Sequence, residues 1–360
     1  MNLQRLAMQN FRGLSASQID LSAEINVFYG DNGAGKSSVI EAIHFLSCCK
    51  SFRTRVLDNL IAYDNDWLSI NAIASKVESG LDHSISVRRI MKKNTVLIDD
   101  TPLYRASQLS QMLPALLVCS ERQRLFIAPP QERRNFLDWG LFHVKPDSIN
   151  LFSKYERSLR QRNASIKNKS NADLVKSWDQ ELIECGQQII GLRAWFIDKL
   201  SEILNRDYAS FYGDFSFAFQ YEDGCGRFHD MAQALNDGFD QDCRYGYTRF
   251  GPHRSEFEVL YSGRNIKDNF SHGQTKLLIY FLALSQAQFI YEAKGVKPWL
   301  LLDDFASDFS EDTLSKAFSV VADSGCQVFI TSAIDLSKYQ QKYPGIYLFH
   351  VEHGNVKKMI

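Results

Sequence analysis

Residues 30–37 constrain the fold most, because they carry the Gly-x-x-x-x-Gly-Lys-Ser spacing of a phosphate-binding loop. The apolar residues 25–29 before the loop predict a buried strand, and residues 38–47 after it predict a helix. Glycines let successive N–H groups point at phosphate oxygens, and the new helix adds its positive end. The alternative is a glycine-rich turn without a ligand. The flanking strand and helix favour a nucleoside triphosphate site over that alternative.

The loop assigns roles to individual side chains. Lys36 is expected to reach the β- and γ-phosphates, where it would assist catalysis, and the Ser37 hydroxyl is expected to hold Mg²⁺. The complete set of nucleotide-binding candidates in the loop is Gly30, Asn32, Gly33, Gly35, Lys36, Ser37 and Ser38.

Composition bounds the class of protein. The chain has 360 residues, of which 45% are hydrophobic and 23% charged, and a net charge of −1. It is therefore long enough for one large or two moderate domains, and any nucleic-acid surface must be a local patch. The seven cysteines form no Cys-x-x-Cys pair, so neither a zinc site nor a disulfide framework is indicated. We see no leader and no apolar run of membrane-spanning length, so we expect a cytoplasmic protein without membrane contact.

The order of the predicted elements indicates an α/β fold. Two antiparallel strands are expected within residues 3–21, and further strands at 67–74, 83–91, 95–98 and 115–119. Two long helices are expected at about 147–167 and, from the apolar stripe Leu174 to Ile203, at 174–203. Strands at 215–221, 256–262, 299–302 and 327–331 then alternate with helices at 273–293 and 312–323, before a closing β pair at 347–359. This order predicts a mostly parallel sheet with an inserted helical region, divided as residues 1–120, 121–240 and 241–360.

Two acids follow the apolar strand 299–302. Asp303 is expected to orient Mg²⁺, and Asp304 to polarise the water that attacks the γ-phosphate. An acidic pair after a strand is often only a turn, but the phosphate loop favours the functional interpretation.

Residues 271–274, Ser-His-Gly-Gln, stand directly before a predicted helix. Ser271, Gly273 and Gln274 could present a hydroxyl and free N–H groups to an anion, although serine is also a common N-cap. The order of phosphate loop, Ser-x-Gly-Gln and acidic strand is that of ATP-binding-cassette ATPases. In those proteins the Ser-x-Gly-Gln of one subunit covers the γ-phosphate bound by the other, which implies a homodimer that forms with ATP.

Further motifs make the resemblance narrower. Asn10-Phe11-Arg12, Ser51-Phe52-Arg53-Thr54, the Arg-Arg-Asn-Phe-Leu-Asp of 133–138 and Gly251-Pro252-His253-Arg254 resemble the RecF family of bacterial recombinational-repair ATPases. The likeness spans almost the whole chain. It implies an ABC/SMC-type P-loop ATPase head with an inserted α-helical lobe.

The resemblance also implies activity and partners. The family's pattern suggests dimerisation with ATP on DNA near single-strand gaps, slow DNA-stimulated hydrolysis, and partnership with RecR and RecO in loading RecA. It places Thr331 where related ATPases have a γ-phosphate sensor. Two positions depart from the family pattern: Ser310 replaces an acid expected at the dimer seam, and Ser255 follows Gly-Pro-His-Arg where an acid is common.

Several alternatives stay open at this level. Arg12 and Arg53 could contact nucleotide or form ordinary salt bridges, and basic clusters at 88–93 and 154–169 could bind DNA phosphates or be solvated surface. A small-molecule kinase would use the same loop but has no need of Ser-x-Gly-Gln. An SMC-like nucleotide-gated scaffold or defence ATPase without a role in RecA loading is the main alternative to a repair ATPase.

Overall fold

The computed structural model describes residues 1–76, 79–119, 125–213 and 216–359, and its chain forms two compact units. One unit combines residues 1–123 with 271–360, and the other comprises 124–270. The domain boundary expected between residues 120 and 121 lies outside the described residues. Residues 241–270, which the sequence groups with the C-terminal part, belong to the second unit, because strand β10 (Glu256–Tyr261) pairs with β9 (Phe217–Glu222). The start of that expected strand, at 215, also lies outside the described residues.

A six-stranded sheet carries the phosphate loop in the first unit. Its order is β15-β14-β3-β13-β12-β8, and all neighbours are parallel except β15. These strands are β3 (Ile25–Tyr29), β8 (Ala115–Val118), β12 (Trp299–Leu302), β13 (Val328–Ser332), β14 (Ile346–Glu352) and β15 (Asn355–Lys358). β3, β8, β12 and β13 are buried almost throughout, as expected of strands covered on both faces.

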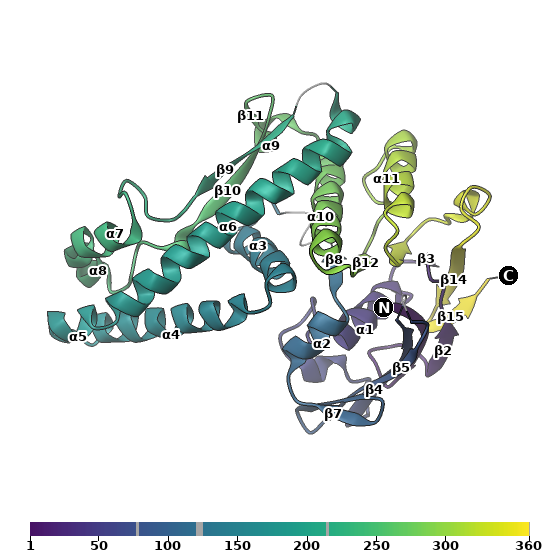
Figure 1. Ribbon diagram of the computed structural model, residues 1–360. Helices are drawn as coiled ribbons and strands as arrows, with labels where there is room; N and C mark the ends of the chain where they lie inside the picture. The colour runs from purple at the N-terminus through teal and green to yellow at the C-terminus, as the bar shows by residue number, and fades with distance from the viewer. Residues whose placement is uncertain (77–78, 120–124, 214–215, 360) are drawn as a thin grey trace. The chain divides into compact units, whose positions relative to one another are not determined.

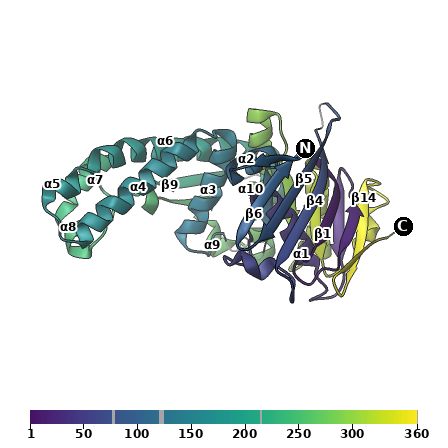
Figure 2. The same ribbon diagram turned by 90° about the horizontal axis from the view of Figure 1, so that it is seen from below.

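The strands near the N-terminus form a second, antiparallel sheet. Its order is β2-β1-β4-β5-β6-β7, and Figure 2 shows several of its strands side by side. The strands are β1 (Asn2–Gln9), β2 (Ser17–Asp20), β4 (Trp67–Ser75), β5 (Asp82–Ile90), β6 (Lys93–Ile98) and β7 (Thr101–Leu103). The α/β class is confirmed. These strands, however, do not belong to the mostly parallel sheet that the sequence predicted. Short turns join most consecutive pairs of them, whereas a parallel pair needs a long crossover connection.

Helix α1 (Lys36–Cys48) shares one hydrophobic core with residues of both sheets, including Leu6, Phe28 and Ile70. Helix α10 (His272–Lys294) is buried over nearly all of 276–290, and α11 (Glu311–Asp323) packs beside it (Figure 1). The remaining elements of this unit are α2 (Ala106–Met112), η1 (Leu57–Leu60) and η5 (Ser337–Tyr339).

The second unit is built on a pair of long helices, α4 (Ser148–Lys167) and α6 (Asp179–Tyr208), which run antiparallel (Figure 1). This pair was expected, but Leu174 was wrongly placed on its apolar stripe. Leu174 is 51% exposed and lies on the separate α5 (Ala172–Lys176), because Asn171 caps that short helix. The other elements are α3 (Pro130–Val144), α7 (Met231–Asp237), α8 (Phe239–Tyr245), α9 (Ile266–Asn269), β11 (Arg264–Asn265), η3 (Ala209–Tyr212) and η4 (Pro252–Arg254).

No helix in the described ranges combines the length and apolar character needed to cross a bilayer.

Candidate nucleotide-binding site

The phosphate loop joins β3 to α1 and needs its glycines. Gly30, Gly33 and Gly35 have φ of +149°, +84° and +109°, which side-chain-bearing residues rarely adopt. A Cβ on Gly30 would lie 2.2 Å from the carbonyl oxygen of Val351 on β14, so this position also lacks space. Asn32 in the loop is exposed, and Lys36 and Ser37 at the start of α1 are half-buried. The loop therefore forms a sharp turn at the N-terminus of α1.

Lys36 lies within the loop and close to the acidic pair. Its Nζ donates to the carbonyl oxygens of Gly30 at 2.7 Å and Asp31 at 2.8 Å. Burial lowers the pKa of Lys36, and the nearby carboxylates of Asp304 and Asp303 oppose that shift. The structure thus brings together the lysine and two acids that are more than 260 positions apart in the sequence.

Asp303 follows β12, which pairs with β13, and β13 in turn pairs with β3. Parallel strands end at the same edge, so Asp303 and the phosphate loop meet there. Asp303 is 7% exposed and its Oδ1 accepts a hydrogen bond of 2.6 Å from Thr331 Oγ1. Thr331 is 1% exposed, and its hydroxyl also accepts from the Asp304 amide at 2.8 Å. The structure therefore gives Thr331 contacts with both acids of the pair.

Asp304 is exposed and has an unusual backbone. Its φ is +55°, in the left-handed region that aspartate tolerates at a modest cost. Its amide is held by Thr331, and its carbonyl accepts from Lys276 Nζ at 3.1 Å and from Ser307 Oγ at 3.0 Å. With both sides of the residue fixed, its carboxylate is presented at the end of a rigid strand.

Ser271 begins α10 with a reciprocal capping box. Its Oγ accepts from the Gln274 amide at 3.3 Å, and Gln274 Oε1 accepts from the Ser271 amide at 2.9 Å. Ser271 and Gln274 are exposed and Gly273 is half-buried. The first amides of a helix lack intrahelical acceptors, so this end of α10 can receive an anion.

Lys276, one turn into α10, ties that helix to the acidic segment. Its side chain is buried, and Nζ donates to the carbonyl and hydroxyl of Ser307 at 2.6 and 2.7 Å as well as to Asp304. Burial lowers the pKa of Lys276 to about 8. The Ser-x-Gly-Gln helix and Asp304 are therefore mechanically connected within one chain.

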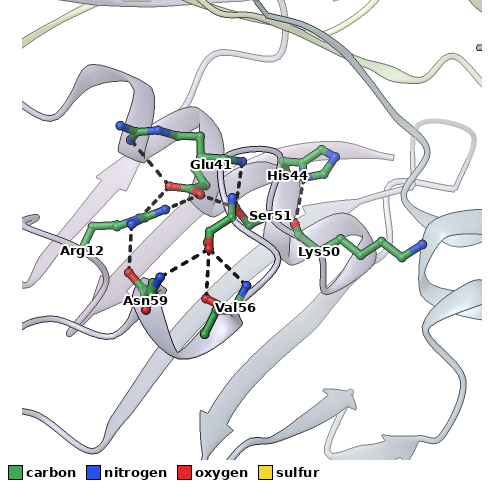
Figure 3. Close-up of polar contacts among 9 residues, drawn as sticks. Arg12, Glu41, His44, Lys50, Ser51, Val56 and Asn59 are labelled. Atoms are coloured by element: carbon green, nitrogen blue, oxygen red, sulfur yellow. Dashed lines mark hydrogen bonds and ion pairs between the residues drawn. The ribbon is translucent and has the colours of Figure 1, made fainter. Parts of the chain in front are cut away.

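Glu41 on α1 organises the arginines beside the loop (Figure 3). Its carboxylate is fully buried and accepts two hydrogen bonds of 2.9 Å from Arg12 and one of 2.5 Å from Ser51. Arg53 Nη1 lies 3.8 Å from the same carboxylate and remains 46% exposed. Arg12 and Arg53 thus form ion pairs with a buried acid at one face of α1.

The contacts of Glu41 and Lys276 were not predicted from the sequence. One sequence feature could have indicated both. Glu41 lies within the mostly apolar run 39–46, and Lys276 begins the apolar run 276–284. Buried charges require partners, so each of these residues indicates an organised polar contact.

Internal contacts reduce the number of basic side chains that the clusters at 88–93 and 154–169 offer to DNA. Arg89 is 7% exposed and pairs with Asp58 at 2.8 Å, while Arg88 lies over the ring of Trp67. Arg162 is fully buried and pairs with Asp179 and Asp242 at 2.7 and 2.6 Å. Neither Arg89 nor Arg162 is therefore available to DNA.

The two departures from the family pattern have local explanations. Ser310 is the N-cap of α11, with its Oγ accepting from the Thr313 amide at 3.4 Å. Ser255 is fully buried and its Oγ accepts from Arg193 at 2.8 Å.

Comparison with known proteins defines the class. Residues 2–353 match the family model described as the RecF/RecN/SMC N terminal domain. The chain resembles the Smc head domain of Pyrococcus furiosus bound to the C-terminal domain of ScpA, with a TM-score of 0.58, 14% identity and coverage of 99% and 96% of the two chains. Together with the phosphate loop and the acidic strand, these matches define an ABC/SMC-type P-loop ATPase head with an inserted α-helical lobe.

The relatives narrow the class to one family. The chain is 32% identical over 363 residues to the DNA replication and repair protein RecF of Pseudoalteromonas translucida (strain TAC 125), with 99% of each chain covered. It is 31% identical over 358 residues to the protein of that name from Shewanella oneidensis, again covering 99% of both. The chain belongs to the RecF family. Its fold matches that of the recombination mediator protein RecF solved with ATP, with a TM-score of 0.85, 22% identity and coverage of 100% and 98%.

Proposed function

We propose that this chain is an ATP-dependent DNA-binding protein of recombinational repair. In this proposal it dimerises with ATP on DNA at junctions between duplex and single-strand gaps, hydrolyses ATP slowly with stimulation by DNA, and helps RecR and RecO load RecA. The observation that carries the proposal is the convergence of Lys36 with Asp303 and Asp304 at one sheet edge, in a chain of the RecF family.

The loop residues fit a triphosphate. Loop amides at the start of α1 and the Lys36 ammonium offer donors to phosphate oxygens, and glycine at the three positions with positive φ places no Cβ there. The Ser37 hydroxyl and the Asp303 carboxylate would hold Mg²⁺, which takes few oxygen ligands from protein when phosphates supply others. Bound Mg²⁺ would neutralise charge on the β- and γ-phosphates.

Asp304 is the proposed catalytic acid–base residue. Its carboxylate would accept a proton from the attacking water, while Lys36 stabilises charge on the transferred phosphoryl group. Ser271, Gly273 and Gln274 would act in trans, covering the γ-phosphate held by a second copy. Lys276 on α10 donates a hydrogen bond to the Asp304 carbonyl. A movement of α10 when the dimer closes would therefore change the position of Asp304.

Sedimentation with and without ATP-Mg²⁺, repeated with gapped duplex DNA, tests the proposal. We expect ATP to produce dimers on DNA, Lys36→Met to abolish nucleotide binding, and Asp304→Asn to bind ATP but accumulate as the dimer. Ser271→Arg should bind ATP as a monomer. A wild-type protein that stays monomeric with ATP, Mg²⁺ and gapped DNA would contradict it.

The role in RecA loading needs its own assay. RecA filament formation on gapped DNA coated with single-strand-binding protein should accelerate when the chain is added with RecR and RecO, and the Lys36→Met chain should give no acceleration. Unchanged filament formation alongside normal ATP-dependent DNA binding would favour a nucleotide-gated scaffold instead.

A further inference from the structure

The Gly-Pro-His-Arg motif, residues 251–254, lies in the second unit, and the nucleotide site described above leaves it unused. Its histidine holds a loop: His253 Nε2 donates to the carbonyl of Thr248 at 3.0 Å, and Nδ1 accepts from the hydroxyl of Tyr155 at 2.7 Å. Gly251 has a φ of +127°, and a Cβ there would lie 2.7 Å from the Tyr155 hydroxyl oxygen. The motif therefore fixes the loop at 246–250 from one side.

A buried polar network fixes the same loop from the other side. The Thr248 amide and hydroxyl both donate to Asn163 Oδ1, at 2.7 and 2.8 Å. The amide of Arg249 donates to Asp242 at 3.0 Å, and Asp242 is held in turn by Arg162. The loop is exposed at its tip yet anchored by buried groups, so its side chains are presented with little freedom.

The anchored loop, the end of α8 and the end of η4 together form what we call the arginine–tyrosine patch, consisting of Arg244, Tyr245, Tyr247, Arg249 and Arg254. The rings of Tyr245 and Tyr247 are 59% and 40% exposed and their centroids lie 6.4 Å apart. The guanidinium of Arg249 lies 4.7 Å from the Tyr245 ring centre, and that of Arg254 lies 5.1 Å from the Tyr247 ring centre. The last residue of the motif thus stacks on an exposed aromatic ring.

The arginines of the patch are not held in salt bridges. Across the described ranges, no carboxylate forms an ion pair with Arg244, Arg249 or Arg254. The buried Asp242 pairs with Arg162 and also attracts Arg249, and the exposed Asp240 lies in the first turn of α8, four residues before Arg244. Guanidinium groups that form no salt bridge and lie beside exposed rings attract an anion that also offers flat faces.

We propose that the arginine–tyrosine patch binds single-stranded nucleic acid, with bases stacking on Tyr245 and Tyr247 and the arginines contacting phosphates. A single strand is favoured over a duplex because duplex bases are already stacked on one another and their faces cannot reach the rings. The proposal rests on the DNA binding in the proposed function and assigns the single-stranded side of the gap to this loop. Gly-Pro-His-Arg would then be the motif that builds the single-strand contact.

Fluorescence anisotropy on the full chain with ATP-Mg²⁺ tests the patch with three probes: oligothymidylate of about 20 nucleotides, an abasic strand of the same length, and a duplex of the same length. Tyr245→Leu combined with Tyr247→Leu should weaken oligothymidylate binding about tenfold or more and leave the abasic strand and duplex within about threefold. Tyr247→Phe should retain binding. Arg254→Gln should weaken oligothymidylate and abasic-strand binding alike and reduce the slope of log K against log salt by about one.

Matched controls lie elsewhere on the surface. Tyr104→Leu removes a ring that is 90% exposed in the first unit, and Arg264→Gln removes an exposed arginine of β11; both should behave as wild type. Unchanged hydrogen exchange of α4 and α6 shows that the second unit of each variant is folded, and unchanged ATP binding shows the same for the first unit.

The outcomes separate the two proposals. If the wild type binds ATP but none of the three probes, the proposed function fails and the patch assignment fails with it. If the wild type binds oligothymidylate and the double tyrosine variant binds it equally well, the patch assignment alone is overturned. An equal loss on the abasic strand would overturn base stacking, and a variant that keeps all DNA binding but no longer binds RecR or RecO would show a protein-docking surface instead.

Discussion

Thr331 Oγ1 donates a hydrogen bond of 2.6 Å to Asp303 Oδ1, which makes a buried hydroxyl the partner of a buried acid. The same oxygen accepts from the Asp304 amide, so one side chain sets both the metal-ligand candidate and the catalytic candidate. The resemblance to related ATPases implied a γ-phosphate sensor at this position, and the contacts of Thr331 in the structure support an additional positioning role.

Replacing Thr331 by valine keeps its shape but removes the hydroxyl. We expect the ATP hydrolysis rate to fall about tenfold or more, with a higher Mg²⁺ requirement, because Asp303 loses a donor and the Asp304 amide loses its acceptor. Thr331→Ser should restore both. Hydrolysis rates measured across a Mg²⁺ titration check this, and a valine variant with the wild-type Mg²⁺ dependence would disprove the positioning role.

Glu41→Gln should destabilise the segment 51–60 relative to α1. The carboxylate is fully buried and its loss leaves Arg12 without a counter-charge. Arg12 is 22% exposed, so solvent reduces the cost to about 2 kcal/mol. Hydrogen exchange of the amides in 51–60 gives the local opening free energy directly. Asp20→Asn, which breaks the exposed Arg5–Asp20 pair, is the matched control and should leave exchange unchanged. Equal exchange in the Gln variant and the wild type would show that Glu41 does not hold this segment.

Arg162→Met should destabilise the second unit by about 3–5 kcal/mol, because it strands the buried carboxylate of Asp242. Burial already raises the pKa of Asp242, against the opposing effect of Arg162. Since the chain has two units, urea unfolding should be followed by hydrogen exchange of α4 and α6 instead of a single global signal. Adding Asp242→Asn to the Met variant should recover part of the loss. No recovery would mean that packing of the guanidinium, and not charge, dominates.

Acid should destabilise the second unit through His253. Burial lowers the pKa of His253 to about 4, and the positive charges of Arg254, Arg134 and Arg193 act in the same direction. Between pH 6.5 and about 4 the unfolded chain binds the proton that the folded chain excludes, so stability falls as the pH falls, by up to about 3 kcal/mol.

His253→Asn should be less stable than wild type at neutral pH, since it loses one of its two contacts, but should show a shallower loss toward acid. Urea unfolding of the second unit at several pH values measures both effects. His229→Asn, at an exposed histidine, should keep the wild-type profile. A wild-type acid profile in the His253 variant would place the titration elsewhere, with His143 as the next candidate because its pKa is also lowered to about 4 by burial.

The sequence by itself determined the local elements, including the strand and the helix that flank the phosphate loop. Glycine spacing, apolar runs and turn residues act over a few positions, so β3, α1, β12 and the capped start of α10 were predictable within about two residues. The same local signals could not show that the first strands form a separate sheet, because tertiary packing determines which strands pair with each other.

Only the tertiary structure decided which charged residues pair with one another. Arg162 and Arg254 both stand in sequence as basic residues, yet one is buried between two aspartates and the other lies over an exposed ring. Glu41 and Lys276 gained their roles in the same way, through partners supplied by distant segments. The physical reason is that burial and pairing, which decide what a charge does, depend on three-dimensional neighbours that residue type and spacing do not specify.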